Sequence, residues 1–388
     1  MTGSPESNVF QWKVALILFG VLFLGVSDTQ LVPLLLSSIA REFQTTPGHT
    51  GIIVASYSLA AAAFALFAGP LSDRIGRKRV LLGGLVLFTV TSFATYQVSS
   101  LNGLIVVRML TGFAAGTLST CALSFAGDHY SYAHRGRAMG IISMAYFLAF
   151  VVGVGPGSIA IKLWGWRSVF IVLGAVSVVI LAVVLTGLPK DGRQTAARFS
   201  AASLASHFGK SDRLAGMAAA FLTSGGLVGF LTYFASWLQT GKGIGIEKIG
   251  LLIMVSGVAA AIASPLSGWL SDHAGKTKVI IGANLILALV FVGVAQLDWS
   301  WPLWVAMAIL SIAASARQAP LHAITTEIVS AEIRGEYTAV RNASSQLGIA
   351  VAATLSAYAF DSQGFAGVSI LAAIMTVMIP LCFFWLRE

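Results

Sequence analysis

The sequence predicts an all-α membrane protein of twelve transmembrane helices, arranged as two similar six-helix bundles. Three observations lead to this prediction: the apolar composition, the spacing of charged residues, and a repeat with an offset of 199 residues. Of the 388 residues, 57% are hydrophobic and only 10% are charged, whereas soluble domains carry about 25% charged residues. The mean hydropathy of +0.85 is typical of a chain that lies in lipid.

Charged residues divide the chain into segments that are long enough to cross a bilayer, which takes about 20 apolar residues per helix. Nine segments of this kind contain no charge: 43–72, 80–107, 138–161, 168–189, 214–241, 249–271, 279–297, 342–360 and 362–386. Three more contain one charge each: 14–37 with Asp28, 103–127 with Arg108, and 302–326 with Arg317. The total is twelve helices, six in each half.

A short charged motif follows the second span of each half. Residues 69–78 read GPLSDRIGRK, and an altered copy, GWLSDHAGKT, occupies 268–277. The Arg-Gly pairs at 135–136 and 334–335 are separated by the same 199 residues. Repeats at a fixed offset indicate duplicated structural units. We therefore predict an N-terminal half (1–188), a cytoplasmic linker (189–213) and a C-terminal half (214–388).

The distribution of lysine and arginine predicts the orientation in the membrane. Sixteen of the 24 fall in loops or termini on one side of the predicted bundle, and five fall on the other. Cytoplasmic loops carry the excess of positive charge, so both termini are expected in the cytoplasm, with the protein in the cytoplasmic (inner) membrane of a bacterium. The formal charge of +9 is explained by these loops, so we expect membrane lipid as a partner and no nucleic acid.

Several classes of function lack their sequence signatures. We find no nucleotide-binding loop, no metal-ligand spacing and no Ser/His/Asp arrangement, and Cys121 and Cys382 lie in apolar spans. The expectation is a protein that is not an enzyme and that uses no cofactor and no metal. A two-half bundle encloses its own pathway, so we expect a monomer.

The motif at 69–78, placed between the second and third of twelve spans, resembles that of the major facilitator superfamily of secondary transporters. The stretch from Asp28 to Pro33 and the run 56–60 (SYSLA) resemble its twelve-helix drug and metabolite proton-antiporter branch. On the fifth span, only Gly155-Pro156 remains in register with the glycine-rich run usual for antiporters. The resemblance implies a central cavity lined by helices one, four, seven and ten.

The resemblance also implies a cytoplasmic gate, in which Asp73, Arg77 and Asp128 form a charge network that clasps the two halves. Gly69 and Gly76 are expected to let the backbone turn sharply and to let helices two and three approach closely, because glycine has no side chain. The full set of predicted gate residues is Gly69, Asp73, Arg74, Gly76, Arg77, Lys78 and Asp128. The alternative is that these charges only anchor loops at the membrane surface.

Charges within the membrane are candidates for function because they are costly there. Asp28 lies about 15 residues, or roughly 22 Å, into the first helix, and Arg108 enters from the other side to roughly 9 Å, so the two reach similar depth. We hypothesise that they face each other across a water-filled cavity and couple protons to transport. A permanent structural pair between two helices is the alternative.

Polar side chains on the remaining spans are candidates for the substrate cavity. Ser311, Ser315 and Gln318 form a polar stripe at helical spacing, which His322 continues. Arg317 and Arg341 lie near the cytoplasmic face, where they either contact substrate or pair with Glu327, Glu332 or Glu336 in a second gate. The predicted cavity residues are Tyr57, Tyr146, Thr223, Ser224, Tyr233, Ser311, Ser315, Arg317 and Gln318.

Three functions are consistent with the sequence. The first is a proton-coupled secondary transporter that exports a small organic molecule, a drug or metabolite, by alternating access in exchange for protons. The second is an uptake symporter or exchanger for an anionic solute, because three intramembrane arginines stand against one aspartate. The third is a non-transporting membrane sensor or scaffold on the same fold.

Overall fold

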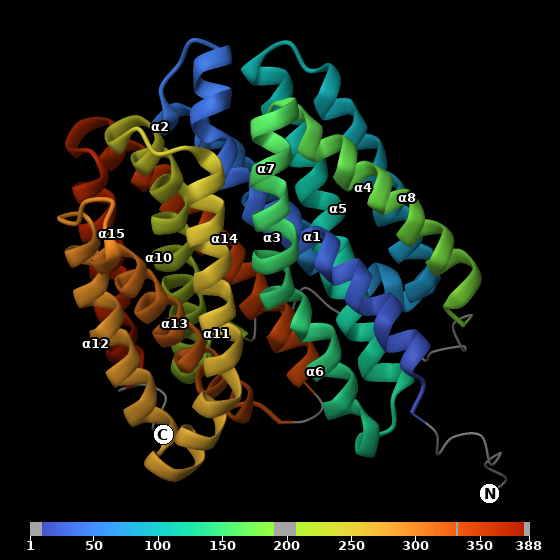
Figure 1. Ribbon diagram of the computed structural model, residues 1–388. Coiled ribbons are helices and arrows are strands. Elements are labelled where there is room, and N and C mark those ends of the chain that lie inside the picture. The colour runs from blue at the N-terminus through green and yellow to red at the C-terminus, as the bar shows by residue number, and fades with distance from the viewer. Residues whose placement is uncertain (1–9, 190–206, 331–332, 384–388) are drawn as a thin grey trace, which may run out of the picture.

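The computed structural model describes residues 10–189, 207–330 and 333–383, and every regular element in these ranges is a helix (Figure 1). Short elements complete several spans: α2 precedes α3, and the π-helical turn η2 (Ala149–Val154) joins α6 to α7. The first half comprises α1 (Trp12–Glu42), α2 (Pro47–Thr50), α3 (Ile52–Ile75), α4 (Arg77–Gln97), α5 (Leu101–His129), α6 (Tyr132–Leu148), α7 (Gly155–Trp164) and α8 (Arg167–Gly187). The second half comprises α10 (Ser211–Lys242), α11 (Ile246–Ala274), α12 (Lys276–Val294), α13 (Trp301–Glu327), α14 (Arg334–Gln363) and α15 (Phe365–Cys382).

The number of spans agrees with the prediction. Within the described residues, eleven helical segments are long and apolar enough to cross a membrane, with α6, η2 and α7 counted as one segment. The twelfth, α13, is less apolar because its second half carries Arg317, Gln318 and His322. Its 27 residues span about 40 Å, so it also has the length to cross. The predicted all-α fold of two six-helix bundles is confirmed.

The two copies of the charged motif form the same turn. Gly76, between α3 and α4, has φ of 102°, and Gly275, between α11 and α12, has φ of 94°. Side chains disfavour this left-handed region, so glycine is required at both turns. The predicted reason for Gly69 is wrong, since a Cβ added there meets no atom within 4 Å and no close helix approach depends on it. We call the end of the bundle with these two turns the basic end, and the opposite end the far end.

Polar contacts between the two halves lie at the far end. Thr46 Oγ1 donates to Asp361 Oδ2 over 2.9 Å, and Tyr233 Oη donates to the carbonyl of Gly48 over 3.3 Å. A third contact joins Lys162, near the end of α7, to Glu247, on the first turn of α11, at 2.8 Å. The far end is therefore closed in this conformer. The short helix α2 lies between the two halves there (Figure 1).

The predicted boundaries of the two halves stay a prediction. The helices of the first half end with α8 at Gly187, and α10 begins at Ser211. Residues 190–206, which make up most of the predicted linker at 189–213, lie outside the described residues.

Candidate functional site

The predicted coupling residues contact each other inside the first half. Arg108 on α5 donates from Nη1 to Asp28 Oδ1 on α1 over 2.8 Å. The ring of Tyr57, on α3, covers the guanidinium at 4.5 Å, and the ring of Phe170, on α8, lies 5.8 Å from it. Thr29 holds the Tyr57 hydroxyl in place with a hydrogen bond of 3.1 Å. Four helices therefore enclose one ion pair.

The expected water-filled surroundings of this pair are absent from the conformer described. Asp28 is 0% exposed and Arg108 is 1% exposed, so the pair is sealed rather than open to a cavity. Asp28 Oδ2 and Arg108 Nε nevertheless make no hydrogen bond within the protein. Buried polar atoms without partners are uncommon and costly, so a change of protonation or conformation at this pair has a large energetic effect. Its coupling role stays a prediction.

Part of the predicted gate forms a compact cluster at the basic end. Arg77 pairs with Asp73 at 2.9 Å and also with Asp128 on α5. Lys78 donates to the carbonyl oxygens of Leu185 and Leu188 at the end of α8. Arg74 is exposed. Both ion pairs of Arg77 lie within the first half, so the clasping of two halves by this cluster stays a prediction.

Arg317 on α13 is sealed inside the second half. It is 0% exposed, and it donates to Asn284 Oδ1 over 2.7 Å and to the carbonyl of Thr223 over 3.2 Å. No carboxylate among the described residues pairs with it. Arg317 thus lies between α10, α12 and α13, which differs from the expectation that it lines an open cavity.

Arg341 on α14 is also buried, at 4% exposure, as is its neighbour Thr325, whereas His322 beside it is exposed. It donates from Nη1 to Thr325 Oγ1 over 3.2 Å and from Nη2 to His322 Nδ1 over 2.5 Å. His322 Nε2 in turn lies 3.2 Å from Gln318 Nε2, and both of these side chains are exposed. The polar stripe of α13 therefore leads directly to a buried arginine.

The other predicted cavity residues divide by exposure. Tyr146, on α6, is 46% exposed, and Gln318 is also exposed. Ser224 and Ser311 are partly exposed. The buried members are Tyr57, Thr223, Tyr233 and Ser315, of which Tyr233 bonds to Gly48 and Ala353 and Ser315 bonds to Ala260. The buried members do not line an open cavity in this conformer, and their contact with substrate stays a prediction.

Two features of this region were missed from the sequence. The first is the contact between His322 and Arg341, for which only the polar stripe on α13 was a signal. The second is the π-helical turn η2 ahead of Pro156. It directly precedes α7, which packs against α11. Such turns occur often at functional sites. The glycines beside Pro156 were the signal in the sequence.

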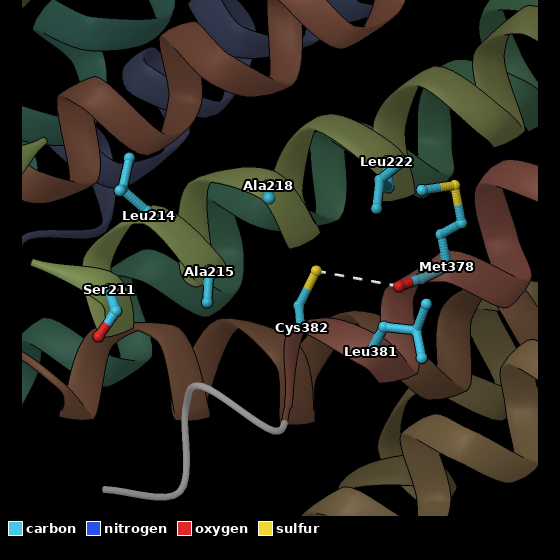
Figure 2. Close-up of a pocket in the computed structure, with 8 residues that line it drawn as sticks. All are labelled: Ser211, Leu214, Ala215, Ala218, Leu222, Met378, Leu381 and Cys382. Atoms are coloured by element: carbon cyan, nitrogen blue, oxygen red, sulfur yellow. Dashed lines mark hydrogen bonds between the residues drawn. The ribbon is translucent and has the colours of Figure 1, made fainter.

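A separate groove on the second half does not suit a polar solute. It has a volume of about 450 Å³ and lies between α10 and α15 near the basic end (Figure 2). Its lining residues are Ser211, Leu214, Ala215, Ala218, Leu222, Met378, Leu381 and Cys382. Ser211 supplies one hydroxyl and no lining side chain is charged, so this groove offers no counter-charge to an ionic solute.

Twelve membrane-spanning helices in two repeated halves, with arginines buried in each half, define a multi-pass membrane transporter. The chain belongs to the Major Facilitator Superfamily, whose sequence model matches residues 17–260 and 217–388. It is an integral membrane transporter of small molecules and not an enzyme, as predicted.

Individual relatives agree with this assignment. The chain is 26% identical to the 4-hydroxybenzoate transporter PcaK of Pseudomonas aeruginosa, over 73% of this chain and 70% of the relative. It is 25% identical to a gallate transporter of Pseudomonas putida, over 84% and 80% of the two chains. The fold is similar to that of a D-xylose-proton symporter, with a TM-score of 0.80 at 15% identity, covering 98% of both chains. It also resembles the nucleoside transporter NupG, with a TM-score of 0.81 at 14% identity, covering 97% of this chain and 100% of the other.

Proposed function

We propose that the protein carries a small organic anion, an aromatic carboxylate or a close relative of one, together with protons into the cell. The observation that carries this proposal is an imbalance of buried charge. Among the described residues, Arg108, Arg317 and Arg341 are buried, against a single buried carboxylate, that of Asp28. A buried charge without a counter-ion is costly, so a site with surplus positive charge favours an anionic ligand.

The names of two relatives support the same chemical class. 4-Hydroxybenzoate and gallate are both aromatic carboxylates, and the transporters named for them align with most of this chain. An anion that enters a cell must move against a negative interior, and each elementary charge costs about 2.3 kcal/mol per 100 mV. Coupling to protons supplies the driving force for such uptake.

Asp28 is the proposed carrier of the proton. Its carboxylate lies 2.8 Å from Arg108, so a proton that binds Asp28 neutralises it and weakens this ion pair. We infer that the proton is taken up on one side of the membrane and released on the other as the conformation changes. Rocking of the two halves about a central site then exposes that site alternately.

The contacts at the far end supply the closed state of one gate. We propose that the basic end is cytoplasmic, with both termini there and its loops against anionic lipid, and that the transporter works as a monomer in the cytoplasmic membrane of a bacterium. In that orientation the conformer described here is closed to the outside. The cluster of Asp73, Arg77 and Asp128 is the proposed clasp of the opposite, outward-facing state.

Proton-coupled export remains the second candidate, since the stretch from Asp28 to Pro33 resembles the antiporter branch. Proteoliposomes that enclose a pH-sensitive dye separate the two. Addition of 4-hydroxybenzoate outside acidifies the interior if protons accompany the anion, and makes it more alkaline if protons are exchanged for it. No change with 4-hydroxybenzoate, gallate or a panel of neutral and cationic solutes would favour a scaffold or sensor instead.

A further inference from the structure

The contacts of Arg341 leave part of its guanidinium available to an anion. Its guanidinium is buried, and its contacts are to the neutral acceptors Thr325 Oγ1 and His322 Nδ1. Its Nε makes no hydrogen bond within the protein. No carboxylate of the described residues forms an ion pair with it. Arginine presents donors in a planar fork that matches a carboxylate, so this group has both unused charge and unused donors.

Nearby acids are engaged elsewhere. Glu327, at the end of α13, pairs with Lys276 at 2.5 Å. Glu336, on the first turn of α14, lies 3.5 Å from His207. Among the described residues, Arg341 therefore pairs with neither Glu327 nor Glu336, and Glu332, the third candidate for a second gate, lies outside the described residues. The positive charge of Arg341 stays uncompensated by the described part of the protein.

The side of Arg341 toward the other half is polar and accessible. His322 and Gln318 are exposed at its edge, next to each other on α13. Tyr146 of the first half is 46% exposed and lies within electrostatic range of the Arg341 guanidinium. The exposed groups beside the buried Arg341 guanidinium are thus the imidazole of His322 and the amide of Gln318.

We propose that Arg341, His322 and Gln318 form the subsite that binds the carboxylate of the substrate, with Tyr146 closing it from the first half. This inference rests on the proposed function and adds the residues that recognise the anion. The carboxylate accepts from Arg341 as the His322 ring turns aside, and Gln318 and Tyr146 provide further donors. Because the residues come from both halves, an occupied subsite links them.

Binding measurements on the purified full-length protein in detergent test the subsite. The probes are benzoate and benzamide, which share the ring and differ in the charged group. Arg341→Gln should weaken benzoate binding by about tenfold or more, the loss expected for one charge-assisted contact, and should leave benzamide unchanged. Arg341→Lys should lose less, because the charge remains. Arg41→Gln, which removes an exposed arginine at the far end, is the matched control and should change neither affinity.

A purely structural arginine would lower both affinities or neither, so the ratio of benzoate to benzamide affinity is the deciding quantity. An unchanged ratio in a folded Arg341→Gln protein overturns the subsite while the proposed function stands. If that variant does not fold, His322→Gln and Tyr146→Phe decide, with a several-fold fall of the ratio expected and an unchanged ratio overturning the subsite. If the unmodified protein neither binds benzoate nor shows the dye response to 4-hydroxybenzoate, the proposed function itself fails, and the subsite with it.

Discussion

The two halves handle buried positive charge in different ways. In the first half, Arg108 has the carboxylate of Asp28 at 2.8 Å, and the pair is sealed under Tyr57. In the second half, Arg317 and Arg341 contact amide, carbonyl, hydroxyl and imidazole groups, with no carboxylate from the described residues. A self-neutralised pair is suited to exchanging a proton, whereas an uncompensated cation is suited to an anionic ligand.

The duplication did not extend to these charges. Displaced by the repeat offset of 199 residues, Asp28 corresponds to Leu227 and Arg108 to Met307. In the reverse direction, Arg317 corresponds to Leu118 and Arg341 to Ile142. The turns at Gly76 and Gly275, by contrast, have nearly the same backbone angles. The repeat thus preserves the framework of the halves, while the buried charges differ between them.

Removing the carboxylate of the first half should have the largest effect. In Asp28→Asn, Arg108 loses its counter-ion, and breaking a buried pair costs about 3–5 kcal/mol of stability. Substrate-driven proton movement in proteoliposomes should be lost, while binding of benzoate in the second half persists. Asp28→Asn combined with Arg108→Gln should regain much of the lost stability, which thermal unfolding would record. Proton movement that survives in Asp28→Asn would remove Asp28 from the coupling mechanism.

The next largest effect concerns the contact between the halves. A Cβ added at Gly51 would lie 1.7 Å from Tyr233 Oη, so Gly51→Ala cannot keep the far end closed as it is. Overpacking of this kind costs about 1–3 kcal/mol, which shifts a two-state population by about 5- to 150-fold. Spin labels at Arg41 and Lys242, one on each half, should report a longer distance.

Gly69→Ala is the matched control, because an added Cβ there meets nothing within 4 Å. It should leave the distance between the labels unchanged. If the two variants gave the same distances, the closed far end would not depend on the fit between Gly51 and Tyr233.

A smaller effect is expected when Arg317, within the second half, is replaced. Arg317→Met removes the donor from Asn284 Oδ1 and from the carbonyl of Thr223, and each buried acceptor left without a partner costs about 1–3 kcal/mol. We expect a lower unfolding temperature, with the ratio of benzoate to benzamide affinity near that of the unmodified protein. A fall of this ratio as large as that in Arg341→Gln would assign Arg317 to the anion site as well.

Surface ion pairs should contribute least. Lys162 and Glu247 join the halves but are 54% and 31% exposed, and such pairs contribute less than about 1 kcal/mol. Lys162→Gln should lengthen the distance between the labels slightly, and more at low salt, where the pair is stronger.

The pair of Lys242 with Asp298 lies wholly in the second half and serves as the comparison. A hydrogen bond from Lys242 holds the pKa of Asp298 below its usual range, so this contribution is present above the ordinary carboxyl pKa and is lost as pH falls through the lowered value. Because Asp298 is 83% exposed, this contribution is small, and Asp298→Asn should change the unfolding temperature little near neutral pH. A clear change in the unfolding temperature of Asp298→Asn near neutral pH would mean that the loop between α12 and α13 contributes to stability.

Much of the framework was predictable. The charge-free segment 168–189 became α8, and 279–297 became most of α12. The helices extend beyond the apolar stretches where charges can reach the membrane surface, as at both ends of α1 with Lys13 and Arg41. The similar depth of Asp28 and Arg108 followed from the sequence, because the rise per residue is constant along a helix. Their sealing from water, the π-helical turn and the contact of His322 with Arg341 did not.

The number, length and duplication of the helices were determined by the sequence itself, because the capacity of about 20 residues to cross lipid is a property of those residues alone. The tertiary structure decided which buried charges acquired a counter-ion. Asp28 and Arg108 meet because α1 and α5 present those faces to each other. Of the glutamates that the structure describes near Arg341, Glu327 and Glu336 contact other partners. Rotation of each helix about its axis depends on packing against several distant segments at once, so no local pattern specifies it.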